Sequence, residues 1–304
     1  GSPIAILKTT KNHYFSNNNS CPDIDLWLND NGKSDIEPNK SKIQRVKETS
    51  EDIYKPHNLR IQFSEIDYTK ICSSVSTNVN TFNKDKHLIF IDPHGYKNIK
   101  LNQIVELLNL GNTEVSLFSP LFDMYRFANK SYDPDFKGGK SLRDFLNSCF
   151  NHQKNNFNSI FEFTDKLKDA FISHTNCFVD TFLLEKEKSN YYGLFFFTPN
   201  ALGFEKMLEA KWKVDTEQGR GFSKRIENQS SLFDTLEISN FPNELINFLK
   251  GKQKTNGELY MFGLKKGYLS KHIIEILKPY RSSNKLIVKD LKGKVMAKNG
   301  YYLS

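Results

Sequence analysis

The chain has 304 residues, of which 38% are hydrophobic and 26% are charged, and its formal net charge at pH 7 is +8. This length is enough for one large domain or two domains of ordinary size. Apolar runs such as residues 194–197 and 88–91 are only four residues long, far below the roughly 20 that a membrane-spanning helix needs. Residues 1–7 lack the basic start of a signal peptide. We therefore expect a cytoplasmic protein without a membrane-spanning segment.

Residues 1–129 alternate short apolar runs with stretches of helical periodicity. The predicted strands are residues 23–30, 59–67, 88–91 and 113–119, and the predicted helices are residues 41–54, 69–79 and 102–110. This alternation is typical of βαβ units and predicts an α/β fold with a doubly wound, mostly parallel, Rossmann-like sheet. Residues 88–91 are continuously apolar, so this strand is expected to be buried on both faces.

The pattern changes at residues 130–189, which we expect to form a helical insertion. The elements predicted here and beyond are helices at 141–150 and 157–171, a strand at 191–198, a helix that buries Phe204, Met207, Leu208 and Trp212, and a polar linker at 219–234. The Rossmann-like domain is therefore expected to comprise residues 1–129 and 190–220.

The excess positive charge lies near the C-terminus. Residues 238–304 contain 13 Lys and Arg residues against four Asp and Glu residues, a net charge of +9, and the rest of the chain is at −1. The predicted elements are a helix at 242–249, a strand at 258–262, a helix at 269–277, a strand at 285–288 and a hairpin turn at 292–294. Two helices followed by a hairpin with a basic tip predict a nucleic-acid-binding winged helix at residues 238–304. The alternative is a Lys-rich face that only contacts solvent.

Three aspartates follow predicted strands, namely Asp30, Asp67 and Asp92. Ligands of doubly wound sheets bind beyond the carboxyl ends of the strands. In a site for an adenosyl cofactor, one such acid accepts the ribose hydroxyls and another accepts the adenine amino group, and the spacing suits Asp30 and Asp67 for these roles. The alternative is that each aspartate only caps a helix or forms a turn.

The sharpest local motif is the turn Asp92-Pro93-His94-Gly95-Tyr96. Such a turn places a carboxylate, a main-chain carbonyl and an aromatic face together, which suits holding the amino group of an extruded base. Asp92, Pro93, His94 and Tyr96 are therefore candidate catalytic residues, with His94 as a general base. The alternative is an ordinary turn stiffened by Pro93 and Gly95.

Several common motifs are absent from the sequence. It has no GxGxxG, GxxxxGK[ST], HExxH or GxSxG pattern, which weighs against dinucleotide oxidoreductases, P-loop NTPases, zinc proteases and α/β-hydrolases. The cysteines are isolated, so neither a zinc site nor a disulfide framework is expected. They are Cys21, Cys72, Cys149 and Cys177.

Four stretches of the sequence, taken together, resemble the three-Cys-motif partner family (TcmP). They are residues 1–6, the turn Asp92-Pro93-His94-Gly95-Tyr96, Glu114-Val115 with Arg126-Phe127 downstream, and Tyr192–Trp212 with its Thr198, Gly203 and Met207. The resemblance covers most of the chain and implies a class I methyltransferase-like domain followed by a winged helix. One departure is His94, where the family has an aromatic residue.

The resemblance also implies an activity, which is methyl transfer from S-adenosylmethionine to nucleic acid, DNA or RNA, with a base exocyclic amine as acceptor. Asp30 and Asp67 would hold the cofactor, and Asp92, Pro93 and Tyr96 would orient the base. The cations expected to bind phosphates are Lys265, Lys266, Lys271, Lys278, Arg281, Lys292 and Lys294. A protein that carries the three-Cys motif is the implied partner.

Two alternatives stay open. The first is a non-catalytic scaffold that binds nucleic acid and recruits a partner protein, with defence against mobile elements as one setting. It is favoured because the family's first strand and glycine-rich loop precede the point at which this chain begins. The second is a nuclease that acts through Asp30, Asp67, Asp92 and a divalent metal.

Overall fold

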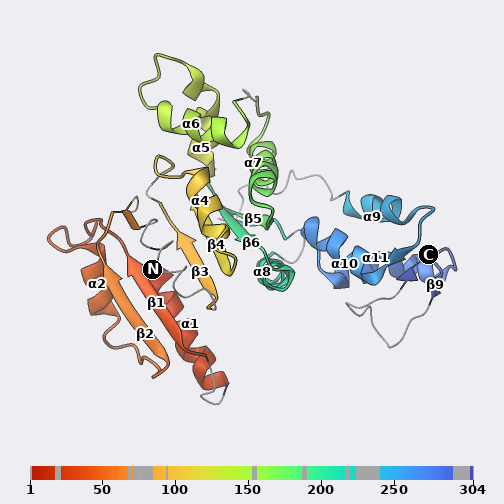
Figure 1. Ribbon diagram of the computed structural model, residues 1–304, viewed down its shortest axis with the longest axis horizontal. Coiled ribbons are helices and arrows are strands. Elements are labelled where there is room, and N and C mark those ends of the chain that lie inside the picture. Colours follow the sequence, from red (N-terminus) through yellow and green to blue (C-terminus); the bar gives the residue numbers. More distant parts are fainter. Residues whose placement is uncertain are drawn as a thin grey trace, which may run out of the picture. The chain divides into compact units, whose positions relative to one another are not determined.

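The computed structural model forms two compact units, residues Gly1–Asn78 and Val79–Ser304, called here the first and the second unit (Figure 1). The residues that it describes are 2–17, 22–67, 70–71, 75, 85–93, 95–152, 156–186, 190–215, 219–223, 240–289 and 302–303. Most of the helix predicted at residues 69–79 lies outside this set, as do the turn predicted at 292–294 and most of the predicted linker at 219–234. Within these ranges, none of the helices has the length and apolar composition required to traverse a bilayer.

In its described residues, the first unit contains a pair of parallel strands, two helices with defined ends, and helical residues at 70–71 and 75. Its elements are α1 (Ser2–Ser16), β1 (Ile24–Asn29), α2 (Lys42–Thr49) and β2 (Leu59–Ser64). The register of β1 and β2 runs from Ile24 opposite Leu59 to Asn29 opposite Ser64, as the strand predictions require. Helix α1, which buries Leu7 and Tyr14, was not predicted from the sequence.

Helix α2 is shorter than the prediction of residues 41–54. It begins where Ser41 accepts a hydrogen bond from the N–H of Gln44 (3.0 Å), which is an N-cap. It ends at Thr49, because Ser50 closes the last turn by donating from Oγ to the carbonyl of Lys47 (2.8 Å).

The second unit is built on a five-stranded sheet with the order β3-β4-β6-β5-β7, of which Figure 1 labels β3, β4, β5 and β6. The strands are β3 (His87–Ile91), β4 (Thr113–Ser119), β5 (Phe178–Glu185), β6 (Tyr191–Thr198) and β7 (Gly221–Ser223). Strands β3, β4, β5 and β7 share one direction, and β6 runs antiparallel to β4 and β5. The α/β class and the mostly parallel sheet are therefore confirmed, whereas an entirely parallel strand arrangement is not observed.

The predicted helical insertion at residues 130–189 is wrong at its C-terminal end. Its helices are present as α6 (Lys140–Cys149) and α7 (Ile160–Thr175), after the short helix η1 (Lys130–Tyr132). Helix α7 ends at Asn176, which adopts a left-handed conformation with φ 52°, and the aromatic and β-branched residues that follow form β5. The sheet therefore resumes about one strand earlier than predicted, and β7 likewise falls inside the predicted linker.

The sheet of the second unit is covered on both faces by helices. On one face, Phe171 of α7 contacts Phe195 and Phe197 of β6, with ring centroids 5.2 and 5.1 Å apart. Helices α4 (Leu101–Leu108) and α5 (Leu121–Ala128) also contact α7. Because side chains alternate along a strand, Phe196 points to the other face, where it packs with Phe204 of α8 (Ala201–Val214).

Strand β3 contradicts the prediction that it is buried on both faces. Leu88 is 67% exposed and Phe90 is 46% exposed, whereas Ile91 is buried. In the described sheet, β3 is an edge strand whose only neighbour is β4. The continuous apolar run therefore reports strand propensity here rather than burial on both faces.

The rest of the second unit is a small helical module, called here the C-terminal module. It consists of α9 (Phe241–Leu249), β8 (Lys254–Thr255), α10 (Asn256–Lys265), α11 (Ser270–Ser282), β9 (Val288–Lys289) and β10 (Tyr302–Leu303). Its three strands pair in the order β8-β10-β9. Its core contains Phe241, Leu245, Leu249, Leu259, Ile273 and Leu277.

The strand predicted at residues 258–262 is wrong, since these residues belong to α10. Thr255 Oγ1 accepts a hydrogen bond from the N–H of Glu258 (3.1 Å), and the Glu258 carboxylate accepts one from the N–H of Thr255 (2.8 Å). This reciprocal pair is a capping box, which starts a helix. The described part of the module therefore has three helices rather than the two predicted.

The C-terminal module contacts the sheet through α8. Trp212 Nε1 donates to the carbonyl of Gly267 (2.9 Å), and Tyr260 donates to Glu205 (3.1 Å). Leu264 of α10 joins the apolar cluster of α8. These contacts explain why the module belongs to the same compact unit as the sheet.

Candidate functional site

Asp30 follows β1 and has a defined orientation. Its Oδ1 accepts a hydrogen bond from the N–H of Gly32 (2.7 Å), and its Oδ2 lies 3.9 Å from Nζ of Lys42. The bond to Gly32 is the contact that the turn-forming interpretation predicts. The side chain is nevertheless 43% exposed, so the carboxylate is accessible to a further donor.

The loop after β2 is fixed to the end of β1 by Asn29. Oδ1 of Asn29 accepts hydrogen bonds from the hydroxyl of Ser64 (2.7 Å) and the N–H of Ile66 (2.9 Å), and its Nδ2 donates to the Ile66 carbonyl (2.9 Å). Trp27 Nε1 donates to the same Ser64 hydroxyl (2.7 Å). These bonds position the chain that leads to Asp67.

Asp67 lies in this loop, close to Asn31, the residue that follows Asp30. Nδ2 of Asn31 donates to Asp67 Oδ2 at 3.5 Å, and the Asp67 carbonyl accepts the N–H groups of Lys70 and Ile71. The structure therefore brings Asp30 and Asp67 to the carboxyl ends of adjacent parallel strands, as the strand predictions require.

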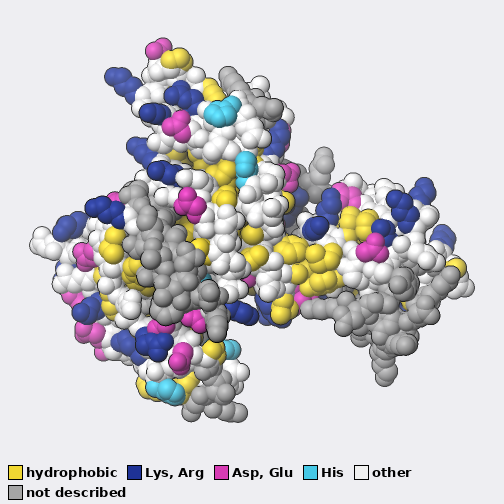
Figure 2. Space-filling view, in the orientation of Figure 1, with side chains coloured by type: hydrophobic (Ala, Val, Ile, Leu, Met, Phe, Trp, Pro, Cys, Tyr) yellow, Lys and Arg dark blue, Asp and Glu magenta, His cyan; other side chains and the backbone are white. Residues whose placement is uncertain are grey.

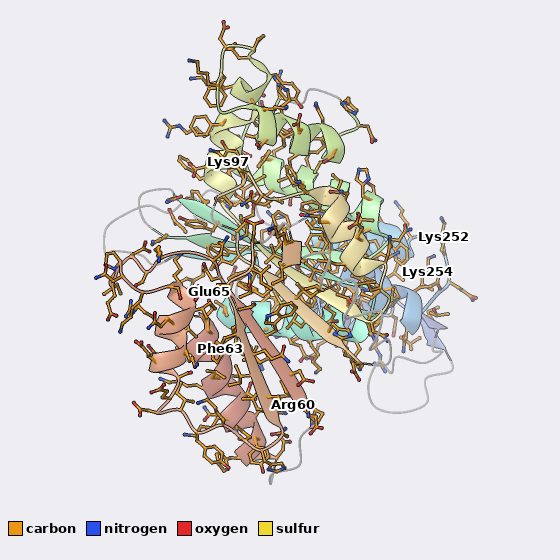
Figure 3. The ribbon with its side chains drawn as sticks, turned by 60° about the vertical axis from the view of Figure 1, so that its left-hand side comes forward. Arg60, Phe63, Glu65, Lys97, Lys252 and Lys254 are labelled. Atoms are coloured by element: carbon orange, nitrogen blue, oxygen red, sulfur yellow. The ribbon has the colours of Figure 1, made fainter. Side chains whose placement is uncertain are left out.

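Glu65 also lies at this end of β2, while Arg60 lies toward the other end (Figure 3). The Glu65 carboxylate accepts a hydrogen bond from the hydroxyl of Ser41. Neither Glu65 nor the two asparagines were predicted, because their proximity to the aspartates depends on the pairing of β1 with β2. The only sequence signal for them is the run of polar residues after each strand.

The turn after β3 holds the predicted catalytic residues, of which His94 lies outside the described residues. Asp92 is exposed, and Gly95 has φ 76°, a conformation that favours glycine in a turn. The pKa of Tyr96 is raised, chiefly by burial and also by the nearby charge of Asp123. Asp92 belongs to the second unit, so only two of the three predicted carboxylates lie in one unit.

A shallow cavity of about 410 Å³ lies at the carboxyl ends of β4 and β5. It is lined by Phe118, Leu184, Glu185, Lys186 and Tyr192. The rings of Phe118 and Tyr192 are stacked, with centroids 5.0 Å apart and planes 11° apart. This cavity was not predicted, because its lining comes from β4, β5 and β6, whose order the sequence does not reveal.

Most of the predicted phosphate-binding cations lie on or next to the C-terminal module's helices. Lys271, Lys278 and Arg281 are exposed along α11, and Lys265 is exposed at the end of α10. Lys266 pairs with Glu244 (2.7 Å). Lys292 and Lys294 lie outside the described residues. Figure 2 shows Lys and Arg side chains over the visible face of the module.

A second group of cations in the module was not predicted. Lys250 and Lys252 are exposed after α9, and Lys254 donates to Glu258 (3.0 Å) while its Nζ lies 4.4 Å from the ring centroid of Phe248 (Figure 3). Their signal in the sequence is three lysines in five residues, which is less conspicuous than the longer basic stretch that begins at Lys265.

The comparisons with known proteins give no family. No protein-family model, no curated protein and no solved structure matches the chain. In the part of the chain that the structure describes, no three His, Cys, Asp or Glu side chains are grouped so that they could hold a metal ion.

Proposed function

We propose that this protein binds nucleic acid through its C-terminal module, binds S-adenosylmethionine through its α/β part, and transfers a methyl group to a base. The observation that carries the proposal is the module itself. Its elements follow the order helix, strand, helix, helix, strand, strand, and exposed cations line its third helix, α11. This order, with a three-stranded sheet closed by β10, supports a winged helix in which α11 is the nucleic-acid-binding helix.

The charge of the module supports the same function. Lys271, Lys278 and Arg281 are spaced along α11 at intervals that keep them near one side of the helix. Cations in such a row neutralise successive phosphates and release counterions, which gives binding that weakens as salt increases.

The proposed fold of the α/β part is Rossmann-like and of the class I methyltransferase type. Two parallel strand pairs support this assignment. Helix α2 lies between β1 and β2 in the chain, and α4 lies between β3 and β4. The reversed strand β6 is a departure from a wholly parallel doubly wound sheet.

The residues present at the ends of β1 and β2 fit an adenosyl group. Asp30 keeps accessible carboxylate surface beside its bond to Gly32, and Asp67 is exposed in a loop held by Asn29. One carboxylate would accept the ribose hydroxyls and the other the adenine amino group. S-adenosylmethionine supplies an electrophilic methyl group on its sulfonium sulfur.

The turn after β3 would orient the methyl acceptor. The Asp92 carboxylate and the Pro93 carbonyl would accept hydrogen bonds from an exocyclic amine, and Tyr96 would contact the ring. His94 would take up the proton that the amine loses. The three-Cys-motif partner protein stays a prediction of the resemblance.

The cofactor half is tested by calorimetric titration of S-adenosylmethionine and S-adenosylhomocysteine into the whole protein. We expect binding, and we expect Asp30→Ala and Asp67→Ala each to weaken it at least about tenfold, a loss of about 1.4 kcal/mol. Asp25→Ala is the matched control, because Asp25 lies at the other end of β1 and pairs with Arg60. Retained nucleic-acid binding without any cofactor binding would favour the scaffold alternative.

The nucleic-acid half is tested by measuring the affinity for duplex DNA and single-stranded RNA at increasing salt. The triple variant Lys271→Ala, Lys278→Ala, Arg281→Ala should weaken binding and lower the slope of log K against log salt by about 0.9 for each phosphate that is no longer neutralised. A control triple variant, Lys47→Ala, Lys137→Ala, Lys140→Ala, removes the same charge from exposed sites elsewhere. Salt-independent affinity, or equal effects of the two triple variants, would contradict the assignment.

A further inference from the structure

The cavity at the carboxyl ends of β4 and β5 lies on one face of the sheet, and the opposite face is buried at this point. Phe118 is opposite Leu194, and Leu184 is opposite Tyr192, so the side chains of Phe118, Leu184 and Tyr192 share one face. On the opposite face, Phe195 is 0% exposed. The cavity therefore has a firmly packed sheet behind it.

Helix α8 leaves this end of the face accessible. It packs on Phe196, which lies farther along β6 than Tyr192, and Phe204 and Leu208 complete that contact. Phe118 and Tyr192 are accordingly only partly buried. Accessible aromatic side chains at the carboxyl edge of an α/β sheet lie where such sheets bind ligands.

The aromatic pair favours a flat ring as the occupant. Phe118 and Tyr192 have nearly parallel planes, and every base can stack on such a ring regardless of its identity. Leu184 adds apolar surface. The volume of about 410 Å³ is within the range of small-molecule sites and is sufficient for a base.

The rim of the cavity carries a cation. Lys186 directly follows β5 and lines the cavity, and its ammonium group can donate to a ring nitrogen or carbonyl of a base. Asn190 Nδ2 lies 3.5 Å from the hydroxyl of Tyr192. Glu185 is opposite Tyr191, whose hydroxyl donates to its Oε1 (2.9 Å), so the Glu185 carboxylate lies on the other face of the sheet from the aromatic pair.

We propose that this cavity, formed by Phe118, Leu184, Glu185, Lys186 and Tyr192, binds a nucleobase of the nucleic acid, which stacks on the outer face of the mutually stacked Phe118–Tyr192 pair. The inference rests on the proposed function and names the part of its substrate that this site takes. The cavity belongs to the second unit, whereas the aspartates at the ends of β1 and β2 belong to the first.

The test is ligand-observed NMR titration of cytidine and guanosine into the whole protein. We expect Phe118→Ala and Tyr192→Ala each to weaken nucleoside binding about tenfold or more, and Phe118→Tyr and Tyr192→Phe to retain it. Tyr54→Ala is the matched control, since Tyr54 is an exposed aromatic residue of the first unit. Cyclohexanol, an apolar probe without a planar ring, is expected not to compete.

Other outcomes separate this inference from the proposed function. Asp67→Ala should leave cytidine binding unchanged, because it alters only the proposed cofactor site. If the protein binds S-adenosylmethionine and duplex DNA but not the nucleosides, or if cyclohexanol competes equally, the inference is overturned and the proposed function stands. If the nucleosides bind in a Tyr192-dependent manner but S-adenosylmethionine does not bind, the cavity assignment stands and the methyl-transfer proposal fails.

Discussion

Gly193 shows at the scale of one residue how tightly the sheet is packed behind the cavity. A Cβ atom at this position would lie 2.3 Å from Cδ1 of Leu121 and 2.9 Å from its Cγ. Leu121 is 0% exposed, so it has no space into which to move. A larger residue at position 193 must therefore shift β6 or α5.

We expect Gly193→Ala to lower the free energy of unfolding by about 1–3 kcal/mol, the usual cost of overpacking a core, measured by urea denaturation. Gly138→Ala is the control, because its Cβ would meet only Cζ of Phe136, at 3.8 Å. Adding Leu121→Val to Gly193→Ala should restore part of this stability. Wild-type stability of Gly193→Ala would contradict this account of the packing.

The residues of the candidate sites differ in how far the sequence reveals them. Asp30 and Asp67 can be predicted because each directly follows an alternating apolar run. Phe118 and Tyr192 cannot be, since they are brought together only by the insertion of the reversed strand β6 between β4 and β5. Local patterns specify which residues end a strand, whereas neighbouring strands are chosen by long-range packing.

Helix α11 illustrates the element scale, because its first turn depends on a histidine. The N–H of Leu269 donates to Nδ1 of His272 (3.1 Å), and the His272 ring lies 4.1 Å from the ring centroid of Trp212. Burial lowers the pKa of His272 from its ordinary 6.5, and the nearby Lys271 adds to this effect. Protonation of Nδ1 would remove the acceptor from this contact.

Because the pKa of His272 is lower in the folded state, the unfolded state binds more protons between that value and 6.5. The contribution of this residue to stability is therefore complete above about pH 6.5 and decreases as the pH falls through this window. We expect the wild type to lose more stability than His272→Gln between about pH 7.5 and pH 5, measured by thermal unfolding. Equal losses in the two proteins would show that His272 does not titrate in this way.

Helix α10 depends on its capping box. We expect Thr255→Ala to destabilise the protein by about 1 kcal/mol, because the N–H of Glu258 loses its acceptor. Thr255→Ser keeps the hydroxyl and should be close to wild type, so chemical denaturation of both variants separates the effect of the cap from that of the methyl group. A Thr255→Ser variant as unstable as Thr255→Ala would argue against the cap.

At this scale the sequence predicts most elements and fails where two signals compete. Strands β1, β2, β4 and β6 match their predictions within a few residues, since their alternating or apolar runs are bounded by turn residues. Residues 258–262 form a helix because the capping box overrides their apolar, strand-like composition. Strand β5 was not predicted, because residues 130–189 contain two helices and the whole segment was therefore assigned to a helical insertion.

At the scale of the whole molecule, a buried ion pair joins the sheet to α8. Lys211 of α8 donates to the carboxylate of Asp180 on β5, and their side chains are 6% and 8% exposed. Lys168 lies 3.9 Å from the same carboxylate. Burial lowers the pKa of Lys211, while Asp180 opposes this change by favouring the charged ammonium.

Removing Lys211 leaves the buried Asp180 carboxylate with only the more distant Lys168 to balance its charge. We expect Lys211→Met to destabilise the protein by about 3–5 kcal/mol, as measured by urea denaturation. The double variant Lys211→Met, Asp180→Leu removes both charges and should be more stable than Lys211→Met alone. If the double variant were as unstable as the single one, the cost would come from poorer packing rather than from an unpaired charge.

The attachment of the C-terminal module to α8 has a further consequence for the proposed function. Trp212 and Tyr260 form hydrogen bonds that join the module to the body of the second unit. Because of these contacts, α11 is held at a fixed position relative to the sheet. A nucleic acid held by α11 would reach the stacking cavity after a set number of nucleotides. The base that stacks in the cavity would then lie at a constant spacing along the strand from the segment that the module binds.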